Sequence, residues 1–264
     1  MKILRYVLAG IVAALVIGLM CYEGFVTHEL DNTSITKGVL ILAGLVLTLL
    51  RGPRQAKATK KDYQIAYGHL IGDAFCQEPK LEKQFYKALD DFNKGRYPVA
   101  LRNLEQLRKH SPRSTEYFAV MVFMALCYDR MGAYEDAIGY YAAALQVREH
   151  STVASNMGTC YLELGKMDEA LECFRRSVRA DASNPNSYNN IAQLYIKLGE
   201  FEKALPYAED ALKINAKLLA ALNAMTICHA MLDNEAESEV YFRRAVACGS
   251  DGKALRAYID NLKS

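Results

Sequence analysis

Residues 164–171 read LGKMDEAL, residues 198–205 read LGEFEKAL, and residues 131–138 read MGAYEDAI. The first two copies lie 34 residues apart, and the third precedes the first by 33 residues. Self-similarity at this period is typical of stacked helix-turn-helix units, each of which buries its apolar face only against its neighbours. The repeated phrase therefore predicts an all-α architecture built from tandem helical pairs.

Aligning the chain on this phrase gives five units, which begin at Leu81, Phe118, Ser151, Pro185 and Leu219. The third unit carries small or aromatic residues at positions 8, 11, 15, 20 and 24, namely Gly158, Tyr161, Gly165, Ala170 and Phe174. With this pattern the chain resembles the tetratricopeptide repeat family over about 170 of its 264 residues. The fifth unit departs from it, because His229, Asp233 and Ser238 replace the Tyr, Gly and Ala.

The resemblance implies a right-handed superhelix of five repeats over residues 81–252, with residues 253–264 as a capping helix. Two physical reasons lie under the pattern. Gly at position 15 accepts the left-handed backbone that ends the first helix of each pair. Ala at position 20 lets the second helix approach the first closely. Such proteins bind polypeptides along the concave side of the superhelix, so the resemblance also implies a protein partner.

Residues 1–50 hold two apolar runs, over about 3–22 and 35–50, which predict a transmembrane helical hairpin. About twenty apolar residues cross a bilayer core of roughly 30 Å, and the shorter second run needs snorkelling at its edge. A cleaved signal peptide is the rival interpretation of the first run, although no small-residue cleavage site follows Met20.

Charge sets the predicted topology of this hairpin. Residues 1–61 carry eight Lys or Arg against three Asp or Glu, a balance of +5, whereas the whole chain is +2. The remainder is therefore −3. Cations precede the first run and fill a basic linker at residues 51–61, so the positive-inside rule places both flanks, and the repeats, in the cytoplasm. The inverted topology remains open.

An amphipathic helix is predicted over residues 62–78, with Asp62 as its cap and an apolar stripe that needs a partner surface. The first two units offer one. Their groove-facing positions are apolar, and these residues are Phe85, Leu89, Val122, Phe123 and Leu126. We therefore expect the helix to pack into this apolar end of the groove. The membrane surface and a separate partner are the alternatives.

Polar residues line the predicted groove in the third to fifth units. Helical geometry turns positions 2, 5, 6, 9 and 13 of each first helix away from the second helix of its pair. The candidate peptide-binding residues there are Ser155, Asn156, Thr159, Asn186, Asn189, Asn190, Gln193, Lys197 and Asn223. Amides both donate and accept, so they bind an extended backbone whatever its sequence. A solvated polar face without a ligand is the alternative.

Several functions find no support in the sequence. A mildly acidic repeat region disfavours nucleic acid. No nucleophile, phosphate-loop or zinc-protease motif occurs, and the five His are scattered. The seven Cys lack clustered spacing, and those inside the helical patterns are interpreted as core residues. We expect no enzyme activity, no catalytic residue, no metal, no cofactor and no small-molecule substrate.

Two functions fit these observations. The first is a membrane-anchored interaction scaffold that presents a cytosolic groove to a partner polypeptide. The second is a structural or assembly subunit of a membrane complex, which contacts its partners mainly through the transmembrane hairpin. In the first span Gly10, Ala14 and Gly18 recur every four residues, which is a spacing that allows close contact between membrane helices.

Overall fold

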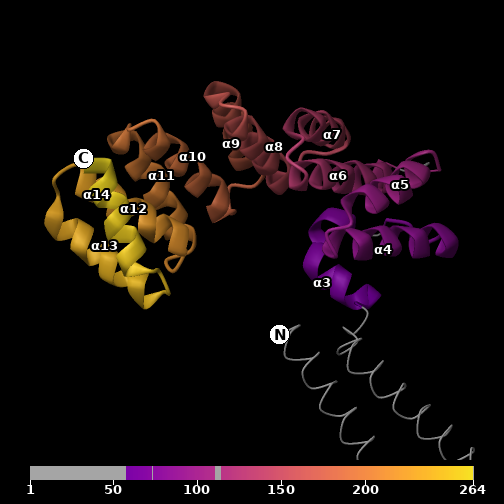
Figure 1. The fold of residues 1–264 in the computed structure, drawn as a ribbon, viewed down its shortest axis with the longest axis horizontal. Coiled ribbons are helices and arrows are strands. Elements are labelled where there is room, and N and C mark those ends of the chain that lie inside the picture. Colours follow the sequence, from indigo (N-terminus) through magenta and orange to yellow (C-terminus); the bar gives the residue numbers. More distant parts are fainter. Residues whose placement is uncertain (1–57, 73, 111–113, 264) are drawn as a thin grey trace, which may run out of the picture. The chain divides into compact units, whose positions relative to one another are not determined.

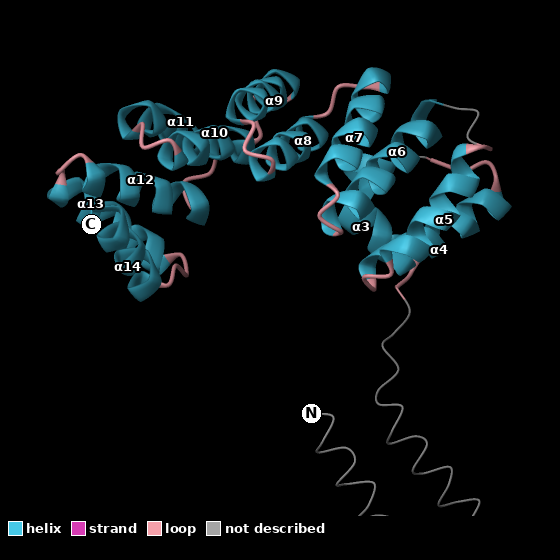
Figure 2. Cartoon of the chain, turned by 45° about the horizontal axis from the view of Figure 1, so that its top comes forward, coloured by secondary structure: helices cyan, strands magenta, loops and turns pink. Residues whose placement is uncertain are grey.

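The computed structural model describes residues 58–72, 74–110 and 114–263, which form a row of helices joined by short turns (Figures 1 and 2). The helices are α3 (Lys60–Ile71), α4 (Pro79–Asn93), α5 (Tyr97–Arg108), α6 (Ser114–Arg130), α7 (Tyr134–Val147), α8 (Ser151–Glu163), α9 (Met167–Ala180), α10 (Pro185–Lys197), α11 (Phe201–Ile214), α12 (Leu219–Met231), α13 (Glu235–Ala247) and α14 (Gly252–Lys263). The predicted all-helical fold of the repeat type is confirmed for this part of the chain.

The predicted transmembrane hairpin at residues 1–50 and most of the basic linker lie outside the described residues. Across the ranges that the structure does describe, no helix combines the length and the apolar character needed to cross a membrane.

Helices α4 to α13 associate in consecutive pairs, and each second helix also packs on the first helix of the following pair. Helix α14 then covers the last pair, packing on α12 and α13 through buried Leu255 and Ile259. Tyr258 on the same helix is exposed. Each pair therefore depends on its neighbours for burial.

Glycine closes the turn inside four of the five pairs. Gly95, Gly132, Gly165 and Gly199 have φ between 72° and 75°, in the left-handed region that favours Gly. Asp233 takes this place in the last pair with φ 57°. These residues end the first helix of each pair and reverse the chain direction, as the sequence pattern predicts.

A second glycine is required by close packing. A Cβ added to Gly158 would lie 2.6 Å from Cε1 of Phe174 and 3.1 Å from Cβ of Cys173. The side chain of Phe174 therefore lies directly against the backbone of α8. The small residue at position 8 and the aromatic at position 24 are thus two halves of one contact.

The N-terminal helix differs from its prediction at both ends. Helix α3 begins at Lys60 because Thr59 caps it, and Asp62 is the third residue of a capping box rather than the cap itself. The helix ends at Ile71, well before residue 78, because Gly72 takes φ 48° and Phe75 takes φ 64° in the turn that follows. Phe75 is nevertheless fully buried.

Substitution by alanine should have opposite effects on stability at a glycine in a turn and at a glycine inside a helix. Gly165→Ala should destabilise the repeats by about 1 kcal/mol, because Ala is strained at φ 74°. Gly139→Ala, at an exposed position in α7 where a Cβ meets nothing within 4 Å, should stabilise them by about 0.5–1 kcal/mol. Urea unfolding of the two variants checks both signs, and a stabilising Gly165→Ala would contradict the assigned turn.

Candidate functional site

The predicted groove residues lie on the first helices α8, α10 and α12, but they differ in accessibility. Three are exposed, namely Thr159, Asn186 and Lys197. Four are half-buried, namely Asn156, Asn190, Gln193 and Asn223. Ser155 and Asn189 are buried, with 8% and 6% of their surface exposed, so their predicted role as accessible groove residues is corrected.

Ser155 is buried because the protein itself uses its hydroxyl. Asn190 donates from Nδ2 to Ser155 Oγ at 2.6 Å, which joins α10 to α8. At the other end of the row, Asn223 Oδ1 accepts from Ser250 Oγ at 2.9 Å. Asn190 therefore links two neighbouring units, whereas Asn223 bonds within its own unit.

Asn189 carries a buried carbonyl oxygen without a hydrogen-bond partner in the part of the chain that the structure describes. Leaving such a group unsatisfied costs roughly 1–3 kcal/mol. Asn189 stands one residue before Asn190 and 34 residues after Ser155, so it occupies the same position in its unit as that serine. Asn189, whose unsatisfied carbonyl oxygen lowers the stability of the fold, therefore lies among the predicted groove residues.

The apolar end of the predicted groove is covered by α3. Phe85, Leu89, Val122, Phe123 and Leu126 are all buried, and α3 contacts both α4 and α6, on which they lie. The Tyr67 ring meets Phe123 edge-on with centroids 5.2 Å apart, and Phe75 packs on Phe85 at 5.1 Å. The expectation that this segment packs into the apolar end is confirmed.

Polar contacts fix α3 in the same place. Tyr67 donates its hydroxyl to Asn93 Oδ1 at 2.6 Å, and Gln64 donates to the Tyr86 hydroxyl at 3.0 Å. Burial and the nearby Asp90 carboxylate raise the pKa of Tyr63 to about 12. These bonds at the edge of an apolar contact define one orientation for the helix.

Two histidines that are far apart in the sequence meet at the C-terminal end of α3. The rings of His69 and His150 lie 5.7 Å apart, and His150 Nε2 is 3.1 Å from the carbonyl oxygen of His69. Burial lowers the pKa of His150, and the Arg148 cation lowers it further. Sequence spacing gave no signal for this pair, because 81 residues separate the two partners.

The titratable groups of the core are shifted by burial. Burial raises the thiol pKa of Cys127, Cys160 and Cys228 to about 12 and that of Cys173 to about 11. A reactive cysteine needs the opposite shift. These four thiols are buried as predicted, whereas Cys248, predicted as a core residue, is exposed after α13.

Asp129 lies among buried groups where α6, α7 and α8 meet. Burial raises the pKa of its carboxyl, with Tyr141 and Cys160 beside it. Burial also raises the pKa of the Tyr141 hydroxyl. All three groups therefore hold their protons more firmly, which is the effect of a dry interior. Among the described residues, no group of His, Cys, Asp and Glu has the arrangement of a metal site.

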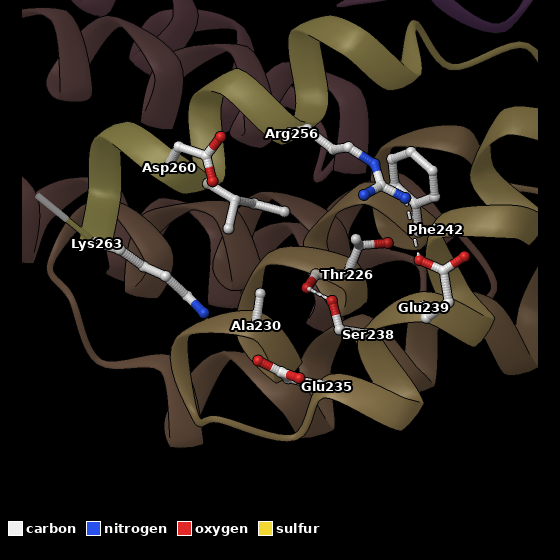
Figure 3. A pocket seen from close by; sticks show the side chains of 10 residues that line it. Thr226, Ala230, Glu235, Ser238, Glu239, Phe242, Arg256, Asp260 and Lys263 are labelled. Atoms are coloured by element: carbon white, nitrogen blue, oxygen red, sulfur yellow. Dashed lines mark hydrogen bonds and ion pairs between the residues drawn. The ribbon is translucent and has the colours of Figure 1, made fainter.

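A cavity of about 210 Å³ opens between α12, α13 and α14 (Figure 3). Arg256 crosses it to Glu239 at 3.2 Å and lies 4.3 Å above the Phe242 ring. Ser238 donates to the Thr226 carbonyl oxygen at 3.0 Å. Thr226 and Ser238 stand at positions 8 and 20, where the other units have Gly or Ala. The cavity thus follows from the degraded fifth unit, and its guanidinium is already paired.

Comparison with known sequences finds tetratricopeptide-repeat proteins that are similar to part of this chain. The family described as Tetratricopeptide repeat matches residues 149–217, and the family described as Anaphase-promoting complex, cyclosome, subunit 3 matches residues 93–177. The chain is 23% identical to BBSome complex member BBS4 of Bos taurus over 57% of its length, and 24% identical to Hsp70-Hsp90 organizing protein 3 of Arabidopsis thaliana over 60%. It spans only 29% and 30% of these two relatives.

Solved structures show the same fold. A tetratricopeptide repeat protein from Parabacteroides merdae superposes with a TM-score of 0.59 at 24% identity, covering 68% of this chain and 72% of that one. MamA from Desulfovibrio magneticus superposes with a TM-score of 0.55 at 16% identity, covering 67% and 96%. The described chain therefore has an all-helical solenoid fold like that of tetratricopeptide-repeat proteins.

The packing of α3 makes a prediction that separates its two faces. Leu70→Ala should weaken the docking of α3 by roughly 2–5 kcal/mol, because Leu70 is buried against the apolar end. Ile65→Ala on the same helix should change it by less than about 0.5 kcal/mol, because Ile65 is 76% exposed. Amide hydrogen exchange in α3 should accelerate roughly 30-fold or more in the first variant only. Equal effects of the two variants would contradict this packing.

Proposed function

We propose that this chain is a membrane-anchored tetratricopeptide-repeat scaffold, which holds an extended segment of a partner protein in the polar groove of α8, α10 and α12. The groove and the repeats lie in the cytoplasm in this proposal. The apolar end of the groove is closed to the partner because α3 occupies it.

The in-phase placement of the polar residues is the observation that carries the proposal. Asn156 and Asn190 stand 34 residues apart, and so do Asn189 and Asn223. Asn190 and Asn223 each use one polar atom within the fold, which leaves the other polar atom of each amide for a ligand. Their recurrence with the period of the fold supports a shared ligand that runs along several units.

The spacing of the helices suits an extended backbone. Packed helices lie about 8–10 Å apart, and an extended chain advances about 3.3 Å per residue, so about three ligand residues span one unit. An amide on each helix then meets one peptide group of the ligand. Asn186 and Thr159 are exposed, and Gln193 and Asn156 are half-buried, so part of each side chain is open to a ligand.

The charge of the groove argues against one class of ligand. Tetratricopeptide proteins that clamp a C-terminal carboxylate use several Lys and Arg on these helices. Here only Lys197 and Arg130 are available, so we propose an internal segment rather than a C-terminal tail. The relatives named Hsp70-Hsp90 organizing protein 3 and BBSome complex member BBS4 are named for protein assemblies, which supports a protein as partner.

The membrane anchor of this proposal rests on sequence. Residues 3–22 and 35–50 are almost uncharged, and cations flank both runs on the side assigned to the cytoplasm. The second candidate function, an assembly subunit that contacts its partners through the hairpin, is favoured by the small residues Gly10, Ala14 and Gly18.

Photo-crosslinking distinguishes the two functions. A photoreactive residue at Gln193, in the groove, should capture a polypeptide that the same residue at Glu209, exposed on α11, does not capture. In the alternative function, a photoreactive residue at Ala14 captures the main partner instead. Crosslinked products from intact membranes, separated by mass, give the readout. Equal capture from Gln193 and Glu209 would exclude the groove.

Thiol labelling tests the topology. Cys76 and Cys248 are exposed, whereas Cys127 is buried and carries no information. In the Cys76→Ser variant, we expect a membrane-impermeant maleimide to label Cys248 only after the membrane is permeabilised. Mass spectrometry of the modified protein measures the extent of labelling. Full labelling of Cys248 in intact cells would place the repeats outside the cytoplasm.

A further inference from the structure

Four of the five helical pairs contain a side-chain contact between positions 11 and 23, twelve residues apart. The rings of Tyr128 and Tyr140 stack with centroids at 5.2 Å and an interplanar angle of 7°. The rings of Tyr195 and Tyr207 stack at 5.7 Å and 23°. In the first pair the same positions hold Asp91, which accepts from Asn103 at 3.2 Å.

The contact persists where the repeat is degraded. In the fifth pair His229 replaces the Tyr of position 11, yet its ring stacks on Tyr241 at 5.5 Å and 7°. His229 thus packs against the second helix of its pair. The fold therefore seats a planar ring on the ring of position 11 even when the identity of that residue changes.

The third pair lacks the second ring. Position 11 holds Tyr161, and position 23 holds Cys173, whose side chain ends at the sulfur. A cavity of about 470 Å³ opens at this place, and both residues line it. Met157 forms a third wall. In the second pair a cavity of about 370 Å³ lies beside the stacked rings of Tyr128 and Tyr140, so the cavity at Tyr161 differs from it in lacking the second ring.

The rim of this cavity is charged. Arg179 pairs with Glu172 at 2.7 Å, and Arg176 forms a two-pronged bond to Glu149 with Nε 2.9 Å from Oε2. Glu169 completes the rim. An apolar seat for one ring inside a polar rim is the arrangement by which protein interfaces hold an aromatic anchor residue.

We propose that the cavity between α8 and α9 is a docking site for an aromatic side chain of a partner polypeptide, which stacks on Tyr161 as the intramolecular rings stack in the neighbouring pairs. The sulfur of Met157 contacts the edge of this ring. The charged rim then pairs with residues that flank the aromatic one in the partner. Because positions 7, 11 and 23 differ from those of the groove, this site does not depend on the proposed function.

The test uses two peptides and the full chain with methyl-labelled Met. The probe is acetyl-Arg-Tyr-Glu-amide, and acetyl-Arg-Ala-Glu-amide is the control. An aromatic ring above Met157 should shift its methyl resonance, so we expect a saturable shift with the Tyr peptide and none with the Ala peptide. The assignment comes from Met157→Leu. The absence of a shift from the Tyr peptide would overturn the proposal.

Two variants of Cys173 test the cavity, because one fills it with a ring and the other leaves it open. Cys173→Tyr supplies the missing ring from within, so binding of the Tyr peptide should weaken at least tenfold, while the size-matched Cys173→Ser should bind as the parent does. We expect Cys173→Tyr to melt at the same temperature as the parent or a higher one. An unfolded Cys173→Tyr, or unchanged binding by it, would show that the cavity is not a ring seat.

Two further measurements complete the test. Tyr161→Leu removes the stacking surface without filling the cavity, so it should lose the shift of the Met157 methyl while the other methyl resonances remain. Free p-cresol, which carries the ring without a backbone, should bind at least tenfold more weakly than the Tyr peptide. Equal affinity would assign the site to a small aromatic molecule and overturn the polypeptide partner.

Discussion

Close contact between the two helices of each pair is the constraint on which the rest of the structure depends. In the third pair, Gly158 at position 8 of the first helix lies against Phe174 and Cys173 of the second helix. At Gly158 even one methyl group would overlap the Phe174 ring. Four pairs keep Gly or Ala at positions 8 and 20 and bury them completely; these residues are Ala88 with Ala100, Ala125 with Ala137, Gly158 with Ala170, and Ala192 with Ala204. The fifth pair has Thr226 and Ser238, and a cavity opens beside them.

The first helices serve two purposes that require different side chains. In α6 an unbroken run from Phe118 to Cys127 is buried, because second helices cover one side and α3 covers another. In α8 and α10 the corresponding outer face is polar, with Ser155 and Asn189 buried and Thr159 and Asn186 exposed. A helix that is apolar all round needs a partner on every side, and α3 supplies the missing one. The division between a closed and an open part of the groove thus follows from the composition of the first helices.

Much of the fold was predictable because its determinants are local and repeated. The role of Gly165 in a turn can be inferred because Gly132 and Gly199 occupy the same position in the neighbouring units. The apolar stripe around Leu70 likewise implied that α3 packs against an apolar surface near α6. Other features depend on single contacts between distant residues. Thr59 rather than Asp62 caps α3, because the hydrogen bonds of the capping box between Thr59 and Asp62 extend the helix N-terminally to Lys60. No periodicity announces that Asn190 reaches Ser155, or that His69 meets His150. The absence of an aromatic residue at position 23 of the third unit, where Cys173 stands, can be read from the sequence. Its structural consequence can be recognised only from the ring stacks of the other pairs.

The contact between α3 and the α7–α8 connection also has a consequence for folding during synthesis on the ribosome. His69 leaves the ribosome 81 residues before His150. At 5–20 residues per second, roughly 4–16 seconds pass before its partner exists. Most contacts of a solenoid form within a pair or between successive pairs, so they follow synthesis closely. The apolar face of α3 is the exception, because it must wait for α4 and α6. The earliest-made of the described helices is therefore covered only after α6 has been made, and during that interval its face is open to chaperones and to neighbouring nascent chains.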